Sequence, residues 1–346
     1  MKLLLYTFIF SVVVIVGVSL IPEKKSGEAA DSGDNSESVA ENTEKKSART
    51  AKGEKNAIPD APSIPAVEVK FKENTLGQRL KELSQTTDFY FGIEENGKTT
   101  NLFIPSKYDI KSIKNSVVKY AHTLQTAREL AKYSELGIIK ESITTIVALS
   151  YTRTFRDAML PLLVSARVQL AEDNFAAAEK EFELAAKLLH TLAEGTFFVL
   201  DLVIINSCLL EYYQIVTSAK LSEAQKKKLL SKLPDREKLS KVLPKILKQE
   251  QTNFINYVLN HSYYTGVGIS ETEFQELKKY PEQKLHEIFD KAARELIDHF
   301  AAGTLTKNTR INVGTELENK IFNQTFCRII GIISENTDKI FGKKDQ

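Results

Sequence analysis

The sequence predicts an all-α protein, in which an irregular antiparallel array of helices follows one N-terminal membrane helix and a disordered tether. The 346 residues include only nine prolines and fifteen glycines, and this scarcity of helix breakers favours long helices. The chain opens with an apolar run that carries no charge, and a polar stretch poor in large apolar side chains follows. Beyond residue 105, apolar side chains recur with the 3.6-residue period of an α-helix.

The N-terminal apolar run covers residues 3–21. As a helix, about nineteen residues at roughly 1.5 Å each span ~28 Å, close to the hydrocarbon thickness of a bilayer. Residues 1–22 are therefore expected to be a signal-anchor or transmembrane helix, or a signal peptide that is cleaved near Gly17 and Ser19. No cysteine lies near the end of this segment, which excludes a bacterial lipoprotein signal.

Both fates of this leader place the rest of the chain in the cell envelope. A retained leader predicts a single-pass inner-membrane protein whose C-terminal domain lies outside the cytoplasm. A cleaved leader predicts a secreted or periplasmic protein.

Residues 23–66 are rich in Ser, Glu, Ala, Lys and Asn. Such a segment cannot bury enough apolar area to offset its chain entropy, so it is predicted to be a disordered linker. Its charges fall into blocks, with acidic side chains from Glu28 to Glu44 before basic side chains from Lys45 to Lys55. As a flexible coil, about forty residues span roughly 35 Å. The segment is either a passive spacer or a charge-patterned docking segment.

Residues 67–342 are predicted to form a single all-α domain. Residues 67–105 are expected to be an irregular cover segment, and residues 106–342 to hold the helices. Within the cover segment, residues 76–83 have a helical pattern. Apolar and aromatic side chains on both sides of Asn96 and Gly97 predict a small hairpin or a packed loop.

The remaining pattern predicts helices joined by short connections, so that neighbours along the chain lie antiparallel. Pro161 either kinks one helix or lies in its first turn. Ser222 with Gln225, and Ser270 with Glu273, have the spacing of capping boxes. The predicted helices cover residues 110–131, 138–151, 155–171, 174–193, 196–219, 236–261, 282–301 and 314–341.

Small and aromatic residues recur along one predicted helical hairpin, at Ala166, Phe175, Ala178, Phe182 and Ala185. This pattern resembles a tetratricopeptide repeat (TPR), and the stretch AEDNFAAAEKEFELAAKLL carries nearly all of the resemblance. The resemblance implies two closely packed helices and a concave face that binds protein segments. Gln169 departs from the tyrosine of that family's first helix, and no second copy follows at the family's interval of about 34 residues. We therefore expect one TPR-like hairpin within a non-repeating array.

The most apolar predicted helix outside the leader carries a carboxylate, Asp201, within the run FFVLDLVIINSCLLEYY. A carboxylate in such a helix must be paired or protonated. Asp201 shares a helix face with Cys208, and Glu211 lies about 80° away. These three residues define a possible polar pocket, and the alternative is an internal salt bridge that fixes helix register. The candidate partners for that salt bridge are Arg153, Arg156 and Arg167.

No catalytic residue, cofactor or metal ligand is predicted. The five histidines do not have the HExxH spacing of a catalytic zinc site. Glu141 and Ser142 form a glutamate-serine pair like that of lytic transglycosylases, but the glycine-rich stretch of that family does not follow them. Cys208 and Cys327 are expected to be two separate buried thiols, and an oxidising envelope would also permit a disulfide between them.

The features together predict a non-enzymatic, membrane-tethered helical scaffold that binds another protein of the bacterial envelope. One alternative is a helical enzyme or small-ligand-binding protein with a polar pocket near Asp201. Another is peripheral association of residues 220–250, which hold ten basic and four acidic side chains, with anionic lipid. The formal net charge of +2 does not imply a polyanionic partner, and no nucleic acid is expected.

Overall fold

The computed structural model describes residues 67–86, 89–95, 98–100, 105–140, 147–148, 150–260 and 270–342. These residues belong to one compact unit, Ala66–Gln346. Over the described ranges the unit is all-α with twelve α-helices, so the predicted all-α class is confirmed. The predicted leader and tether, residues 1–22 and 23–66, lie outside the described residues.

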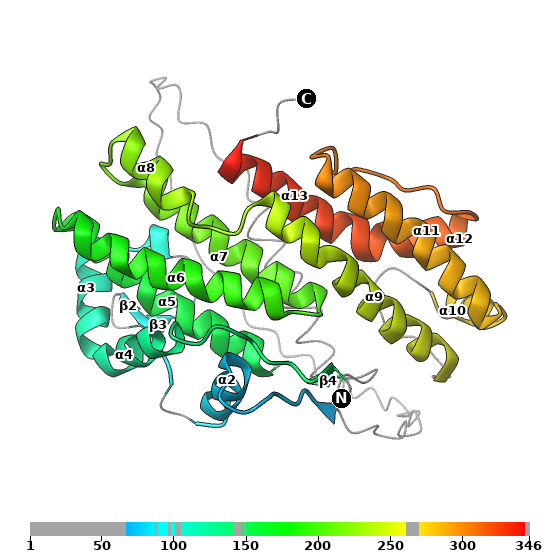
Figure 1. The fold of residues 1–346 in the computed structure, drawn as a ribbon, viewed down its shortest axis with the longest axis horizontal. Coiled ribbons are helices and arrows are strands. Elements are labelled where there is room, and N and C mark those ends of the chain that lie inside the picture. The colour runs from blue at the N-terminus through cyan, green and yellow to red at the C-terminus, as the bar shows by residue number, and fades with distance from the viewer. Residues whose placement is uncertain are drawn as a thin grey trace, which may run out of the picture. The chain divides into compact units, whose positions relative to one another are not determined.

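The elements are named in chain order (Figure 1). The α-helices are α2 (Leu76–Ser84), α3 (Ile110–Lys119), α4 (Ala121–Leu130), α5 (Ser150–Ala171), α6 (Phe175–Gly195), α7 (Val199–Ser218), α8 (Glu223–Leu230), α9 (Arg236–Asn260), α10 (Glu271–Leu277), α11 (Glu282–Ala301), α12 (Glu316–Phe322) and α13 (Arg328–Phe341). A 3-10 turn, η1 (Pro105–Lys107), precedes α3, and a π-helical turn, Asn323–Cys327, joins α12 to α13. The strands are β1 (Val67–Glu68), β2 (Ile93–Glu95), β3 (Lys98–Thr100) and β4 (Val147–Ala148).

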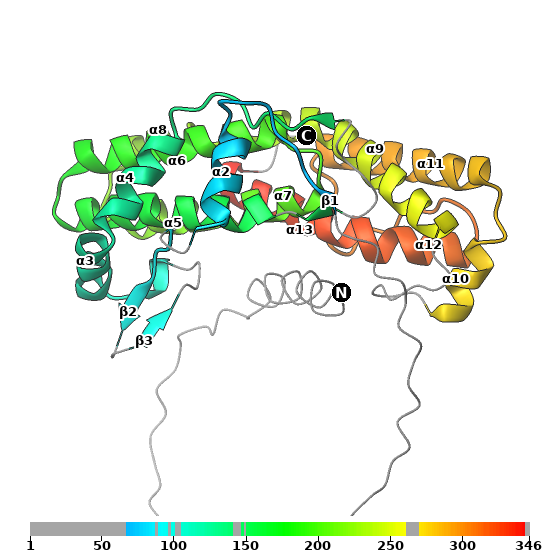
Figure 2. The same ribbon diagram turned by 90° about the horizontal axis from the view of Figure 1, so that it is seen from below.

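The long helices lie in two layers (Figure 2). Helices α6, α9 and α11 form one layer, and α5, α7 and α13 form the other. Helix α5 contacts α6 and α7, and it also contacts the short helices α2, α3 and α4. At the other end of the unit, α11 contacts α9, α12 and α13.

Helix α7 is the core helix that joins these two ends. It contacts α5, α6, α9 and α13. Among the described helices, only α7 is long and apolar enough to cross a membrane, and 72% of its apolar stretch is buried inside the protein. Its apolar surface is therefore covered by neighbouring helices, as expected for a core helix.

Several predicted helix starts are confirmed at the level of individual side chains. The hydroxyl of Ser222 accepts a hydrogen bond from the backbone of Gln225, and the Gln225 side chain accepts one from the Ser222 backbone. Ser270 and Glu273 form the same reciprocal pair at the start of α10. Asn174 caps α6, where a sharp connection follows α5.

The cover segment contains the predicted hairpin. Strands β2 and β3 pair antiparallel, with Ile93 opposite Thr100. Phe91 and Ile93 are buried in a cluster that includes Leu160 and Val164 of α5, so this segment covers one face of α5. The predicted turn residues between the strands lie outside the described residues.

The predicted long helix over residues 110–131 is wrong, because the chain turns at Tyr120 between α3 and α4. Tyr120 has φ −105° and ψ 33°, outside the helical region. Its ring packs against Tyr90 and Phe91, with centroids 5.8 and 5.4 Å away. Both α3 and α4 contact α5, so the turn lets each of them pack on the same core helix.

The predicted helix over residues 138–151 is also wrong. Ile138 forms an isolated bridge with Phe71, and the Ile139 amide donates to the Lys70 carbonyl at 2.9 Å. Strand β4 pairs in parallel with β1 at the start of the unit. Backbone pairing with residues about seventy to eighty positions earlier overrides the helical period. Pro161 lies in the interior of α5 rather than in its first turn.

Candidate functional site

Asp201 lies in the first turn of α7 and is completely buried. Its Oδ2 atom accepts hydrogen bonds from the Tyr151 hydroxyl at 2.7 Å and the Thr196 hydroxyl at 2.5 Å. Its Oδ1 atom has no hydrogen-bond partner among the described residues. The partners of the Asp201 carboxyl group are therefore two hydroxyl groups, whereas one alternative from the sequence was a salt bridge with an arginine.

The three candidate arginines bind elsewhere. Arg153 lies 3.8 Å from Asp157, one turn along α5, and Arg156, the residue before Asp157, lies 3.6 Å from it. Arg167 donates to the carbonyl of Pro105 in the 3-10 turn η1. The predicted salt bridge to Asp201 is therefore wrong, and a neutral hydroxyl network takes its place.

Burial raises the pKa of Asp201 to about 7, although the hydrogen bonds from Thr196 and Tyr151 lower it. The negative charge of Glu250 on α9 raises this pKa further. Glu250 accepts a hydrogen bond from the backbone N–H of Val199 at 3.0 Å. This N–H is one of those at the start of α7 that have no carbonyl partner within the helix, so Glu250 caps the helix. Burial also raises the pKa of Glu250. Two carboxyl groups thus share the N-terminal end of the core helix.

Glu211 lies farther along α7 and faces a different environment. It is 6% exposed, and its Oε2 atom accepts a hydrogen bond from the Ser106 hydroxyl at 3.1 Å. Burial raises its pKa to about 7, while hydrogen bonds from Ser106 and the charges of Lys107 and Arg167 lower it. Glu211 therefore fixes the turn η1 against α7.

Cys208 lies between Asp201 and Glu211 along α7 and is completely buried. Burial raises the pKa of its thiol far above the ordinary value. The structure thus places Asp201, Cys208 and Glu211 on one helix, but each carboxyl group bonds to its own set of neighbours. A carboxyl group with a pKa near 7 suits proton transfer, yet Asp201, Tyr151 and Thr196 are all enclosed in the core. This arrangement suits a packing role better than chemistry on a ligand.

The second cysteine, Cys327, lies in the π-helical turn and is also a buried free thiol. Burial raises its pKa to about 12. The two cysteines are therefore separate buried thiols in this structure, as the sequence predicts.

The hairpin residues form the contact between α5 and α6. Ala166, Ala178 and Ala185 are completely buried, as their small size at a close helix contact requires. Phe182 is buried as well, and its ring lies 4.5 Å from that of Tyr212 on α7. Phe175, at the start of α6, is half-buried. Helix α7 covers the inner side of this hairpin at Phe182, so that side is occupied by the protein itself.

The basic residues between 220 and 250 pair extensively with acidic side chains. Lys228 lies 2.6 Å from Glu179 on α6, and Lys232 lies 2.5 Å from Glu183 on the same helix. These contacts attach α8 and the turn that follows it to the acidic edge of α6. Hydrogen bonding to Lys228 is the main reason that the pKa of Glu179 is lowered. Much of the predicted basic surface is thus neutralised within the protein.

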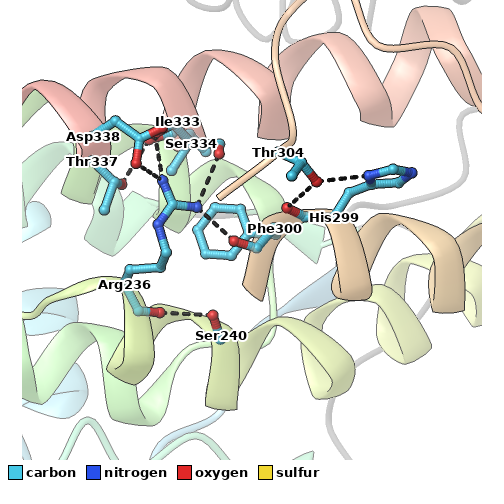
Figure 3. A network of polar contacts seen from close by, with 9 residues as sticks. All are labelled: Arg236, Ser240, His299, Phe300, Thr304, Ile333, Ser334, Thr337 and Asp338. Carbon is cyan, nitrogen blue, oxygen red and sulfur yellow. Dashed lines mark hydrogen bonds and ion pairs between the residues drawn. The ribbon is translucent and has the colours of Figure 1, made fainter. Parts of the chain in front are cut away.

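Arg236, at the start of α9, binds two other helices at once (Figure 3). Its guanidinium donates to the Phe300 carbonyl of α11 at 2.5 Å. It also donates to Ser334 at 3.0 Å and to Asp338 at 2.5 Å, both on α13. The guanidinium lies over the Phe300 ring, 5.1 Å from its centroid. This network, which we call the Arg236 clamp, holds α9, α11 and α13 together.

Two of the described histidines form local hydrogen bonds. His190 Nε2 lies 2.9 Å from the Lys232 carbonyl oxygen, and His299 Nδ1 lies 2.8 Å from the Thr304 hydroxyl. Over the described ranges, no group of three or more His, Cys, Asp or Glu side chains is placed to hold a metal ion. Glu141 and Ser142 lie outside those ranges.

A surface groove of about 490 Å³ lies along α12, the π-helical turn and the start of α13. Sequence reasoning did not identify this groove, because the 3.6-residue pattern across it contains no distinctive motif. Its lining residues are Arg310, Glu316, Asn319, Lys320, Asn323, Gln324 and Arg328. A second, smaller groove of about 280 Å³ lies between α2 and α4, around Tyr133.

Comparison with known proteins identifies no relative of this chain. The chain matches no protein-family model, no curated protein and no solved structure. The resemblance of α5 and α6 to a tetratricopeptide repeat therefore remains a prediction from the residue pattern.

Proposed function

We propose that this chain is a membrane-tethered helical scaffold of the bacterial cell envelope, and that its helical unit binds another protein. In this proposal the leader anchors or exports the chain, the tether gives it reach, and an irregular antiparallel helical array with a TPR-like hairpin forms the binding body. The groove along α12 and α13 carries the proposal. Both arginines of its lining, Arg310 and Arg328, form no ion pair with any described carboxylate.

The interior of the unit also supports binding at the surface, because it offers a ligand few free polar groups. Its most buried carboxyl groups already have partners within the protein: Asp201 binds hydroxyl groups, Glu211 binds Ser106, and Glu181 binds Arg128. Carboxyl groups that already bond inside a core contribute to packing and are less available to a ligand, although the Oδ1 atom of Asp201 has no partner among the described residues. Recognition by surface side chains is therefore favoured over an interior pocket.

Site-specific photo-crosslinking in native membranes tests the proposal. A photoreactive residue at Gln324, which is exposed in the groove, is expected to crosslink to a distinct protein band. The matched control is Gln125, an exposed glutamine on α4 outside the groove. A protein captured at position 324 but not at position 125 supports the scaffold. Equal capture at both positions, or no capture at either, contradicts it.

A small-ligand site near Asp201 is the second candidate, and the unpartnered Oδ1 atom is the observation that favours it. Tyr151, Thr196 and Asp201 are each at most 1% exposed, so a ligand would have to open the core to reach that atom. Association of residues 220–250 with anionic lipid is less favoured, because Lys228, Lys232 and Lys238 already pair with glutamates of α6.

A further inference from the structure

The groove along α12 and α13 has a rigid floor. The Asn323 side chain accepts the Ile311 amide at 2.8 Å and donates to the Ile311 carbonyl at 2.9 Å. Asn319 accepts the Val313 amide at 2.7 Å. These two amide side chains clamp the loop before α12 onto the helix. A binding surface that is fixed in advance loses less entropy when a partner binds.

The charges of the groove are unevenly balanced. Lys320 is paired with Glu273 on α10 at 2.7 Å, so its charge is offset. Arg310 donates to the neighbouring Thr309 carbonyl at 3.2 Å, is exposed, and forms no ion pair within the described part of the chain. Arg328 is also exposed, and no described carboxylate pairs with it. One acidic side chain, Glu316, lies in the same lining.

The backbone beneath the groove is unusual as well. A π-helical turn, Asn323–Cys327, interrupts an otherwise continuous helix from α12 to α13. Gln324 within this turn and Arg328 just after it both line the groove. Short π-helical turns inside α-helices occur frequently at functional sites. This backbone feature and the unpaired arginines are independent observations on the same surface.

We propose that this groove binds an acidic segment of a partner protein, through carboxylates held by Arg310 and Arg328. This inference rests on the proposed scaffold function and specifies the chemistry of its partner. A guanidinium group presents parallel N–H donors that match the two oxygens of a carboxylate. A volume of about 490 Å³ accommodates a few residues of an extended segment.

The remaining lining favours a peptide over a phosphate or a lipid headgroup. The exposed amide of Gln324 can both donate to and accept from a peptide backbone. Glu316 can accept a backbone N–H, a donor that phosphate lacks, and it repels negative charge in either kind of ligand. The apolar stems of the arginines and Lys320 add a surface on which side chains of a segment pack.

Fluorescence anisotropy with the full chain in uncharged detergent micelles tests this inference. The probe is a fluorescein-labelled peptide of six Glu-Ala repeats, and its Gln-Ala counterpart reports binding that does not need carboxylates. The double variant Arg310→Gln/Arg328→Gln is expected to weaken binding of the acidic peptide about tenfold or more, because charge-assisted hydrogen bonds are lost. Glu316→Gln is expected to strengthen binding, which keeps the test informative if the double variant fails to fold.

The matched control is Lys111→Gln/Lys227→Gln, which removes the same charge from exposed positions on α3 and α8. It is expected to change the affinity less than about twofold, since screened charges outside the groove contribute only weakly. Equal weakening by both double variants would show a general charge effect and overturn the inference. Displacement of the probe by inorganic phosphate, but not by free glutamate, would also overturn it.

The two proposals fail in different ways. If Arg310→Gln/Arg328→Gln still crosslinks to the same protein through position 324, the acidic-segment inference is wrong and the scaffold proposal stands. If the wild-type chain captures no protein at position 324, the scaffold proposal itself is contradicted, whatever the peptide binds.

Discussion

Asp201 makes the stability of the folded unit depend on pH. Its pKa is about 7 in the folded chain, against an ordinary value of 3.8, so the folded state holds a proton that the unfolded state releases. The stability from this proton is fully present below about pH 4 and is lost as the pH rises through about 7, at up to ~1.4 kcal/mol per pH unit. Asp201→Asn removes this titration and is expected to make the decline in the free energy of unfolding shallower, measured with urea between pH 4 and 8. Part of the remaining decline comes from Glu211, whose pKa burial also raises to about 7.

The control for this prediction is Asp109→Asn. Asp109 caps α3, and hydrogen bonds from Ser112 lower its pKa, so its contribution has the opposite sign and is lost only as the pH falls. This variant should therefore keep the decline in stability between pH 4 and 7. A wild-type free energy of unfolding that does not fall in this range would contradict the account of Asp201, and Glu250→Gln would test the neighbouring carboxyl group.

Sequence reasoning at this scale identified the burial of Asp201 but not its partners. A charged residue within an apolar helix must be paired or protonated, and this rule correctly led to a polar neighbour. The choice between arginine and hydroxyl depended on Tyr151, fifty positions earlier. The incorrect helix over residues 138–151 ended at Tyr151, so its proximity to Asp201 was not foreseen.

The Arg236 clamp is expected to stabilise the contact of α9 with α11 and α13. Arg236→Lys keeps the positive charge but loses the planar fork that binds Phe300, Ser334 and Asp338 together. We expect a loss of about 1–3 kcal/mol in the free energy of unfolding. The control Arg153→Lys changes an arginine whose side chain is 72% exposed, and should stay within about 0.5 kcal/mol. Equal effects of the two substitutions in chemical denaturation would contradict a specific role for the clamp.

The segment before β4 depends on a close approach at Gly137. Gly137 has φ +73°, and a Cβ atom there would lie 2.4 Å from the Thr75 side chain. Gly137→Ala is expected to lower the melting temperature through both backbone strain and this clash. Gly303→Ala is the matched control, because Gly303 has φ +71° but its Cβ would have no atom nearer than 3.8 Å. A larger effect at Gly137 than at Gly303 isolates the close approach, and equal effects would contradict it.

At the level of elements, patterns within one segment were more predictive than pairings between segments. The capping boxes at Ser222 and Ser270 were predicted because all of their atoms come from four consecutive residues. The turn at Tyr120 was missed, because its cause is an aromatic contact with a segment about thirty residues earlier. The extended backbone at Ile138 was missed for the same reason. Its partner, Phe71, lies near the start of the unit, far away in sequence.

At the level of the whole unit, composition and period were enough to predict the all-α class, but not the two layers (Figure 2). The layers result from which helices share the apolar surface of α7, and periodicity gives the apolar face of each helix without identifying its partner. The groove along α12 and α13 has the same origin. Its arginines, Arg310 and Arg328, are separated in sequence by a loop and a helix and meet only in the folded chain.

The burial of α7 leads to a prediction about topology. Both α7 and the apolar run of residues 3–21 have the length of a membrane span, but α7 is covered by α5, α6, α9 and α13 in the folded unit. If the leader alone directs the chain to the membrane, a C-terminal alkaline phosphatase fusion, which is active only outside the cytoplasm, should be active. Val13→Lys/Ile15→Lys in the leader should abolish that activity, since a lysine at the centre of a span costs about 2.5–3.5 kcal/mol.

Thr217→Lys, at an exposed position of α7, should leave it unchanged, because no membrane contact of α7 is lost. Activity that survives the leader variant but not the Thr217 variant would assign the membrane span to α7 and contradict its role as a core helix.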